Sequence, residues 1–282
     1  MVAELREEVR AARAAGQRVG LVPTMGAFHE GHLSLMRRAR ATCGLVVVSL
    51  FVNPAQFTEA ADLERYPRDE ARDQGLAEGA GTDLLFAPEV DEVYPPGFAT
   101  AVEVSEVSEP LEGRVRGVAH FRGVATVVTK LFNMVQPDVA FFGQKDAQQA
   151  LLVRRMVRDL DLPIHVEVCP TIREADGVAM SSRNVLLTPE SRRRAPALHA
   201  ALRGVADDVA AGERDSARLL ARALALLAER RVEVEYLSIA SAETLAPVPT
   251  VIGDVLVAIA AKFGAVRLID NVLLSGPRQE SR

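Results

Sequence analysis

Apolar runs alternate with amphipathic segments along the first two thirds of the chain. The apolar runs are rich in branched and aromatic residues, are bounded by Pro or Gly, and predict strands at 18–23, 45–52, 82–88, 137–143 and 163–170. Helical periodicity separates them and predicts helices at 32–42, 64–80, 123–136 and 146–161. Strands that are apolar on both faces and separated by helices predict a parallel α/β sheet, with right-handed crossovers.

The pattern changes after about residue 187. Thr188-Pro189-Glu190 is typical of a helix start, with Thr as the cap and Pro in the first turn. Helical stretches rich in Ala and Arg follow, and then three strand candidates at 232–240, 254–263 and 265–272. We therefore expect two domains: a Rossmann-like domain at 1–186 and a smaller C-terminal α+β domain at 187–282.

Composition narrows the function without fixing it. The chain has 282 residues, of which about half are apolar and a quarter charged, as in ordinary globular proteins. A net charge of -5 gives no support to a broad surface for nucleic acid or anionic membranes. The N-terminus lacks the apolar core of a signal peptide, and no apolar run reaches the ~20 residues of a membrane-spanning helix. Cys43 and Cys169 have no CxxC spacing, which argues against a disulfide framework or a structural zinc site. We expect a cytoplasmic protein.

Four polar or glycine-rich segments directly follow predicted strands. They are PTMGAFHEGH (23–32), NPAQF (53–57), GQKD (143–146) and PTIREADGVAMSSRN (170–184). Ligands of open α/β sheets bind beyond the carboxyl ends of the strands. We therefore expect these segments to share the ligand-binding edge of the sheet.

The first of these segments contains two histidines three residues apart. Gly26 and Gly31 have the spacing of a P-loop, but His32 stands where that motif has Lys, and the spacing is also not that of HExxH. One interpretation is an anion site, in which glycines admit the ligand, a helix N-terminus faces it, and His29 and His32 donate to phosphate oxygens. The other is a plain strand-to-helix turn with solvated or core-satisfied histidines.

The other segments are also ambiguous when taken singly. Lys145 of GQKD is either a point charge for a phosphate or a surface lysine. The two serines and Arg183 of AMSSRN suit a departing pyrophosphate but also suit a polar turn. Gln56 and Gln149 can orient a hydroxyl or a carboxylate, or be surface amides.

Eight segments, in order from about residue 20 to 272, together resemble one family. They are VPTMGAFHEGHLSL, VVSLFVNPAQF, RYPRD, HFRGV, KLFNMVQPD, FFGQKDAQQ, DGVAMSSRN and RLIDN, and the family they resemble is pantothenate synthetase, or pantoate–β-alanine ligase. The resemblance implies the Rossmann-like fold of the HxGH nucleotidylyl-transferases, with the second domain covering the active site. It also implies ATP-dependent ligation of pantoate to β-alanine, in the pathway to coenzyme A, through a pantoyl adenylate, with release of AMP and pyrophosphate. A homodimer is implied, as is Mg²⁺ held mainly by the ATP phosphates and water.

The resemblance also implies roles for individual residues. His32 stands at the position usually assigned as catalytic, and His29, Lys145 and Arg183 would spread the charge on the phosphoryl oxygens. Gln56 would contact both pantoate and β-alanine, and Gln149 would contact pantoate. The residues expected to bind ATP are Met25, Gly26, Ala27, Phe28, His29, Glu30, Gly31, His32, Gly143, Gln144, Lys145, Asp146, Ile172, Met180, Ser181, Ser182 and Arg183. The mechanism needs no protein nucleophile, and no Ser-His-Asp or Cys-His arrangement is evident.

Two points stay open. Residues 116–121 read RGVAHF where the family usually has a proline and one residue fewer, so the conformation of this loop is not predicted. Asp69 of YPRD is either a solvated helix acid or an aid to a metal through water. Two other functions share some of the motifs: a nucleotidylyltransferase that stops at an adenylated product, and a module that senses ATP without chemistry.

Overall fold

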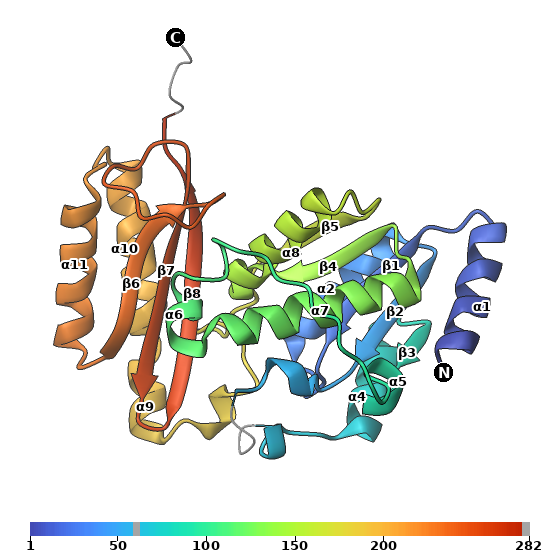
Figure 1. Cartoon of the computed structure of the whole chain (residues 1–282). Helices are drawn as coiled ribbons and strands as arrows, with labels where there is room; N and C mark the ends of the chain where they lie inside the picture. The colour runs from blue at the N-terminus through green and yellow to red at the C-terminus, as the bar shows by residue number, and fades with distance from the viewer. Residues whose placement is uncertain (59–62, 278–282) are drawn as a thin grey trace, which may run out of the picture. The chain divides into compact units, whose positions relative to one another are not determined.

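The computed structural model describes residues 1–58 and 63–277, and the chain divides into two compact units (Figure 1). Unit 1 comprises Met1–Gln144 and Gln148–Pro170, and unit 2 comprises Lys145–Ala147 and Thr171–Arg282. Unit 2 thus begins before residue 187, where we expected the second domain to start. The physical reason is a long-range ion pair between Arg173 and Asp270, which ties the segment after Pro170 to the end of the chain.

Unit 1 contains the predicted parallel sheet. Its strands are β1 (Val19–Thr24), β2 (Leu45–Leu50), β3 (Leu84–Phe86), β4 (Val139–Gly143) and β5 (His165–Cys169). They lie in the order β3-β2-β1-β4-β5, and each neighbouring pair is parallel. The predicted fold class, an α/β protein with a Rossmann-like sheet and a smaller α+β part, is confirmed.

Helices connect these strands. They are α1 (Val2–Ala14), α2 (Glu30–Thr42), η1 (Pro54–Gln56), α4 (Glu70–Gly79), α5 (Val90–Val93), α6 (Glu112–Arg116), α7 (Val118–Val135), η2 (Gln144–Asp146) and α8 (Ala147–Asp159). The helix predicted at 64–80 is shorter in the structure, because α4 begins only after Asp69, whose carboxylate accepts the Arg72 N–H and caps it. The atypical residues 116–121 form the end of α6, a joint at Gly117 with φ +82°, and the start of α7.

Both faces of the central strands are buried. Leu21 and Val22 are each 0% exposed, although neighbouring side chains leave a strand on opposite faces. Val22 and Val48, which pair across β1 and β2, share one cluster with Met36 of α2 and with Phe141 of β4. Burial on both faces explains why these strands are continuous apolar runs in the sequence.

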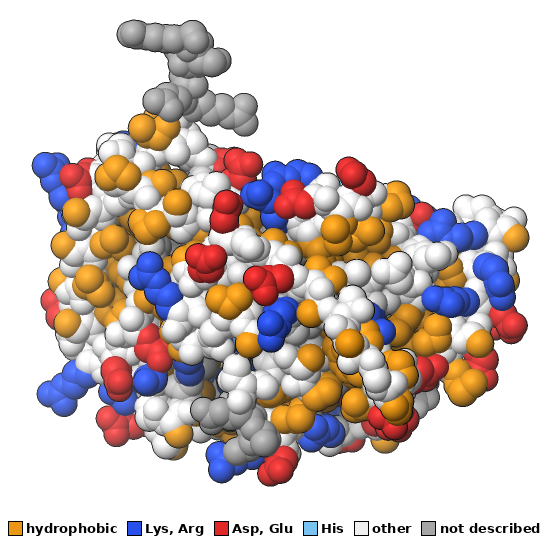
Figure 2. Space-filling view, viewed as in Figure 1, with side chains coloured by type: hydrophobic (Ala, Val, Ile, Leu, Met, Phe, Trp, Pro, Cys, Tyr) orange, Lys and Arg blue, Asp and Glu red, His pale blue; other side chains and the backbone are white. Residues whose placement is uncertain are grey.

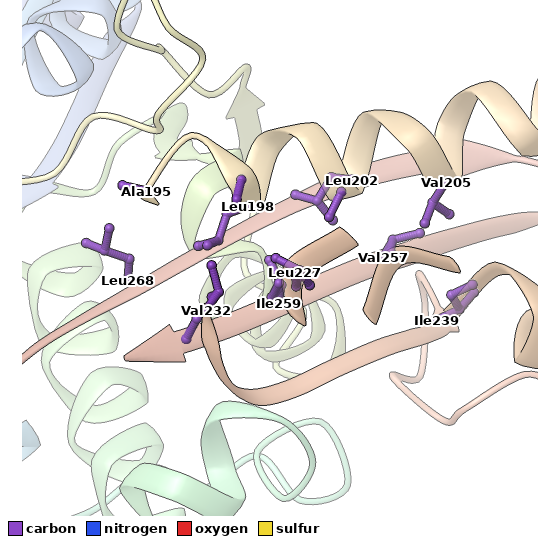
Figure 3. Packing of buried hydrophobic residues seen from close by; sticks show 14 of the residues in the cluster. Ala195, Leu198, Leu202, Val205, Leu227, Val232, Ile239, Val257, Ile259 and Leu268 are labelled. Atoms are coloured by element: carbon purple, nitrogen blue, oxygen red, sulfur yellow. The ribbon is translucent and has the colours of Figure 1, made fainter. Parts of the chain in front are cut away.

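Unit 2 has its own core. Helices η3 (Asn184–Leu186), α9 (Pro189–Arg194), α10 (Ala197–Ala210) and α11 (Ser216–Glu229) precede an antiparallel sheet of β6 (Glu233–Ser241), β7 (Asp254–Phe263) and β8 (Val266–Ser275). Thr188 caps α9 as predicted, by accepting the Ser191 N–H. Leu198, Leu202 and Val205 project from one side of α10 toward Val257 and Ile259 of β7 (Figure 3). This spacing is that of an amphipathic helix face on a sheet.

The surface carries charges of both signs. On the face shown in Figure 2, Lys and Arg side chains are interspersed with Asp and Glu, without a large patch of one sign. Within the described residues, no helix is both long and apolar enough to cross a membrane.

Candidate active site

The strand order of unit 1 locates the ligand-binding edge. From β1 the chain first continues to β2 and β3 on one side of the sheet, and later to β4 and β5 on the other. The order therefore reverses between β1 and β4, and ligands of such sheets bind at that point beyond the carboxyl ends. Two of the predicted motifs leave the sheet there: Met25–His32 follows β1, and Gln144 follows β4.

The segment after β1 makes a tight turn into α2. Gly26 (φ +85°) and Ala27 (φ +53°) both have left-handed backbone conformations, the first of which glycine adopts without cost. Helix α2 begins at Glu30, two residues earlier than predicted, so that His29 is its N-cap and His32 lies in its first turn. The two histidines thus lie where backbone N–H groups and the helix dipole favour an anion.

The two imidazoles lie against each other. Nδ1 of His29 accepts the Gly31 N–H at 3.1 Å, and Nδ1 of His32 accepts the His29 N–H at 3.4 Å. The ring centroids are 4.2 Å apart with an angle of 36° between the planes. The rings are half-buried, and their backbone bonds fix them as a pair at the mouth of α2.

Asp73 of α4 braces this turn, a role that was not predicted from the sequence. Its carboxylate accepts the Ala27 N–H at 2.6 Å and the Phe28 N–H at 2.8 Å. The side chain is 1% exposed, and Arg72 beside it donates to the Phe28 carbonyl. A buried carboxylate with two backbone donors holds the left-handed turn in place. No local signal marks Asp73, because it lies within a helix whose other acids are exposed.

Gln56 follows β2 and is also held by residues that were not predicted. Asn53, 0% exposed, donates to Oε1 of Gln56 at 3.0 Å and accepts the Tyr94 hydroxyl at 2.8 Å. Nε2 of Gln56 lies 3.1 Å from the sulfur of Met25, which joins this segment to the one after β1. Burial raises the pKa of Tyr94 to about 12. The only signal in the sequence was the position of Asn53 directly after a strand.

Gln149 lies beside a structural glutamine on α8. Gln149 itself is half-buried. Its neighbour Gln148 accepts the Glu112 N–H and donates to the carbonyls of Val107 and Pro110. These three bonds tie Gln148 to the segment before α6, and the predicted binding role of Gln149 stays a prediction.

Lys145 belongs to unit 2. It lies in η2, directly after Gly143 and Gln144, and its ammonium group is 3.3 Å from the carboxylate of Asp146. Its backbone carbonyl accepts the side-chain amide of Asn271 on β8 at 2.9 Å. The polypeptide around Lys145 is thus fixed by a residue far away in the sequence.

The predicted Ser-Ser-Arg loop is the exit of a small hairpin in unit 2. The Met180 N–H donates to the Ile172 carbonyl at 2.9 Å, and residues 173 and 179 form an isolated antiparallel bridge. The turn of the hairpin carries Glu174 and Asp176, which both pair with Arg192 of α9 at 2.6 Å. This hydrogen bond from Arg192 lowers the pKa of Asp176.

Past the hairpin, Ser181 and Ser182 are half-buried and Arg183 is exposed. The Arg183 N–H donates to the Ser181 hydroxyl at 3.2 Å, and Asn184 donates to Glu174 and to the Ala179 carbonyl. Hydrogen bonds therefore hold the loop near both ends, and Arg183 between them is exposed. Exposure of this kind suits a group that contacts a bound anion.

The described ranges, 1–58 and 63–277, contain no group of three or more His, Cys, Asp or Glu side chains arranged to hold a metal. Asp69, which we considered as an indirect metal ligand, instead caps α4.

The chain is similar to known proteins along nearly its whole length. The sequence model of the pantoate-beta-alanine ligase family matches residues 1–273. A pantothenate synthetase of Moorella thermoacetica is 53% identical over 276 residues, which cover 97% of this chain and 96% of the relative. A second, of Roseiflexus sp., is 53% identical over 269 residues, covering 95% and 96%.

Solved structures that are similar to this chain come from the same family. The crystal structure of pantothenate synthetase from Thermus thermophilus has a TM-score of 0.84 at 48% identity and covers 94% of this chain and 96% of its own. That of pantoate-beta-alanine ligase from Francisella tularensis, complexed with beta-gamma ATP and β-alanine, has a TM-score of 0.77 at 31% identity and covers 95% of both chains. The predicted family and the predicted class of enzyme, a ligase, are confirmed. The chain belongs to the pantoate–β-alanine ligase family.

Proposed function

We propose that this chain joins pantoate to β-alanine in two steps on one molecule of ATP. In the first, the pantoate carboxylate attacks the α-phosphorus, and the bond to pyrophosphate breaks. In the second, the amine of β-alanine attacks the carbonyl of the pantoyl adenylate, loses a proton, and expels AMP. Family membership supports the overall ligation, and the complex of the Francisella tularensis relative supports ATP and β-alanine as ligands.

The observation that carries the proposal is the histidine pair at the switch point of the sheet. Residues 25–32 would surround the phosphates of ATP, with the backbone N–H groups of the turn and the first turn of α2 facing the anion. His32 and His29 would donate to oxygens that gain charge as the α-phosphorus is attacked. Lys145 and Arg183 would neutralise the departing pyrophosphate. The remaining proposed ATP contacts are Gly143, Gln144, Asp146, Ile172, Met180, Ser181 and Ser182.

Gln56 is proposed to bind both pantoate and β-alanine, and Gln149 to bind pantoate. Gln56 is held on two sides, by Asn53 and by the sulfur of Met25, so that its amide is oriented before substrate arrives. An oriented neutral amide can bind a carboxylate or a hydroxyl without changing its charge. This preorganisation lowers the entropic cost of bringing carboxylate and ATP together.

Mg²⁺ is proposed as the cation that accompanies ATP. Mg²⁺ with nucleotides is usually held by phosphates and water with one or two carboxylates, and it shields the phosphate charge. Asp146, which is half exposed beside Lys145, places one carboxylate in this motif. We also propose that the protein is a cytoplasmic homodimer and binds neither nucleic acid nor membrane.

Isotope exchange tests the proposal. Labelled pyrophosphate should enter ATP when pantoate is present, without β-alanine, and AMP and pantothenate should form once β-alanine is added. Absence of pantoate-dependent exchange would sink the proposal, and exchange without amide formation would favour a nucleotidylyltransferase that stops at the adenylate. ATP binding without either reaction would favour a sensing module.

A histidine variant tests the assignment of the site. His32→Ala should lower the exchange rate by roughly a hundredfold or more, as loss of a transition-state donor does. His165→Ala is the matched control, because His165 is exposed at the amino end of β5. Equal exchange rates in the two variants would remove His32 from the mechanism.

A further inference from the structure

The segment RLIDN (267–271) resembles a family signature, but the proposed function gives it no role. It lies on β8, in register with the middle of β7. Asp270 is 3% exposed and Asn271 is 5% exposed. Burying two adjacent polar side chains in a strand is costly unless each finds partners. Their partners identify what they do.

Asp270 holds the hairpin that leads to the Ser-Ser-Arg loop. Its two carboxylate oxygens lie 2.6 and 2.9 Å from Nη1 and Nη2 of Arg173, a bidentate ion pair. Nη1 of Arg173 also donates to the Gly177 carbonyl at 3.0 Å, across the turn of the hairpin. The guanidinium therefore fixes both the entering arm and the turn. The hairpin's other arm continues directly into Met180–Arg183.

Asn271 holds the polypeptide at Lys145. Its side-chain amide donates to the Lys145 carbonyl at 2.9 Å, and its own N–H donates to the Asp270 carboxylate at 2.8 Å. Successive side chains of a strand point to opposite faces. Asp270 and Asn271 can therefore reach two different segments from one point on β8.

We propose that Asp270 and Asn271 are positioning residues that fix Lys145 and the 180–183 loop to a common point on β8. This inference rests on the proposed function, since it matters only if Lys145 and Arg183 bind the phosphates of ATP. Lys145 and Arg183 lie on separate segments, and their cations must match the spacing of phosphate oxygens. A shared strand sets that spacing before ATP binds. Less conformational entropy is then lost on binding than if the two cations were on independently mobile segments.

A double-mutant cycle tests the link between Asn271 and Lys145. Asn271→Asp keeps the size of the side chain but puts an acceptor in front of the Lys145 carbonyl. It should lower pantoate-dependent exchange by roughly ten- to a hundredfold. In a Lys145→Ala background the same change should cost less than about twofold, because the group it positions is gone. If exchange becomes too slow to follow, the Kd for ATP can be measured by calorimetry instead. The cycle then compares the unsubstituted protein, the two single variants and the double variant.

Asn133→Asp is the matched control. Asn133 also donates its side-chain amide to a backbone carbonyl, that of Thr129, but on the exposed face of α7. Its exchange rate should equal that of the unsubstituted protein. If Asn271→Asp does not fold, Asn271→Ser takes its place, since it removes the amide without adding charge.

The outcomes separate the inference from the function. If the unsubstituted protein lacks pantoate-dependent exchange, the proposed function fails. If it exchanges normally and Asn271→Asp is as active as Asn133→Asp, the positioning role fails. An equal loss in the presence and absence of the Lys145 side chain would also overturn it, because Asn271 would then act on the fold in general.

Discussion

The brace that Asp73 provides to the turn before His29 allows a sharp test, through Asp73→Asn. The carboxylate now accepts two N–H groups, from Ala27 at 2.6 Å and from Phe28 at 2.8 Å. An Asn of the same shape has one acceptor oxygen, so one N–H would face an NH₂ group instead. Losing one charge-assisted bond costs about 1.5–3 kcal/mol, and the remaining neutral bond is weaker by about 1 kcal/mol.

The total of about 2.5–4 kcal/mol appears in one of two ways. If the turn keeps its shape, the free energy of unfolding falls by that amount. If the turn relaxes, the competent conformation becomes rarer, and exchange falls by about 60-fold to 700-fold at about 1.4 kcal/mol per factor of ten. Because Gly26 and Ala27 have left-handed conformations and the carboxylate of Asp73 accepts the Ala27 N–H, we expect relaxation, with the main loss in exchange.

The assay is pantoate-dependent exchange of pyrophosphate together with urea unfolding. Asp138→Asn is the control, since Asp138 accepts the Val19 N–H at 2.7 Å at the amino end of β1, the edge away from the ligand. It should lose stability but keep its exchange rate. Equal effects of the two variants on exchange would refute the idea that Asp73 shapes the site.

Three further predictions concern the surroundings of the site. Gly123→Ala should lower both stability and activity, because its Cβ would lie 2.2 Å from the Ala55 carbonyl oxygen beside Gln56. Thermal unfolding measures the loss of stability and pyrophosphate exchange measures the loss of activity. An unchanged melting temperature would contradict the contact. Tyr94→Phe should raise the KM for pantoate severalfold by removing one of the hydrogen bonds that hold Asn53, with the KM for ATP as the internal control. Burial lowers the pKa of His199, so folding favours its neutral form. The stability that this histidine contributes is therefore present above its unfolded pKa of about 6.5 and is lost as the pH falls below that value. Replacement by Gln should reduce the loss of stability between pH 7.5 and pH 5, and an unchanged loss would exclude this histidine as the cause.

The sequence predicted the sheet well because the signal is local. Strands buried on both faces leave continuous apolar runs, and five such runs gave all five strands of the parallel sheet. The predicted position of the histidine motif, directly after β1, followed from the same runs. The start of α2 was misplaced by two residues, because a histidine is an unusual N-cap and gives no warning.

The sequence could not predict the long-range hydrogen bonds and ion pairs that hold the segments of the site in place. Asp73 bonds to a residue 46 positions away, and Arg173 bonds to one 97 positions away. Periodicity and capping patterns extend over only a few residues. In the sequence, a buried acid within a helix or strand cannot be distinguished from an exposed one. The ion pair between Arg173 and Asp270 likewise links the hairpin to the strands of unit 2 over a long stretch of sequence.

The cap of α2 fixes the protons of the histidine pair. Nδ1 of each ring accepts a backbone N–H, so neither nitrogen can carry a hydrogen. In the neutral form of each imidazole the hydrogen is then carried by Nε2. Adding a proton to either ring would remove an acceptor from the first turn of α2. The helix start thus selects the tautomer, and the chemistry of the pair depends on a backbone bond as much as on the imidazoles themselves.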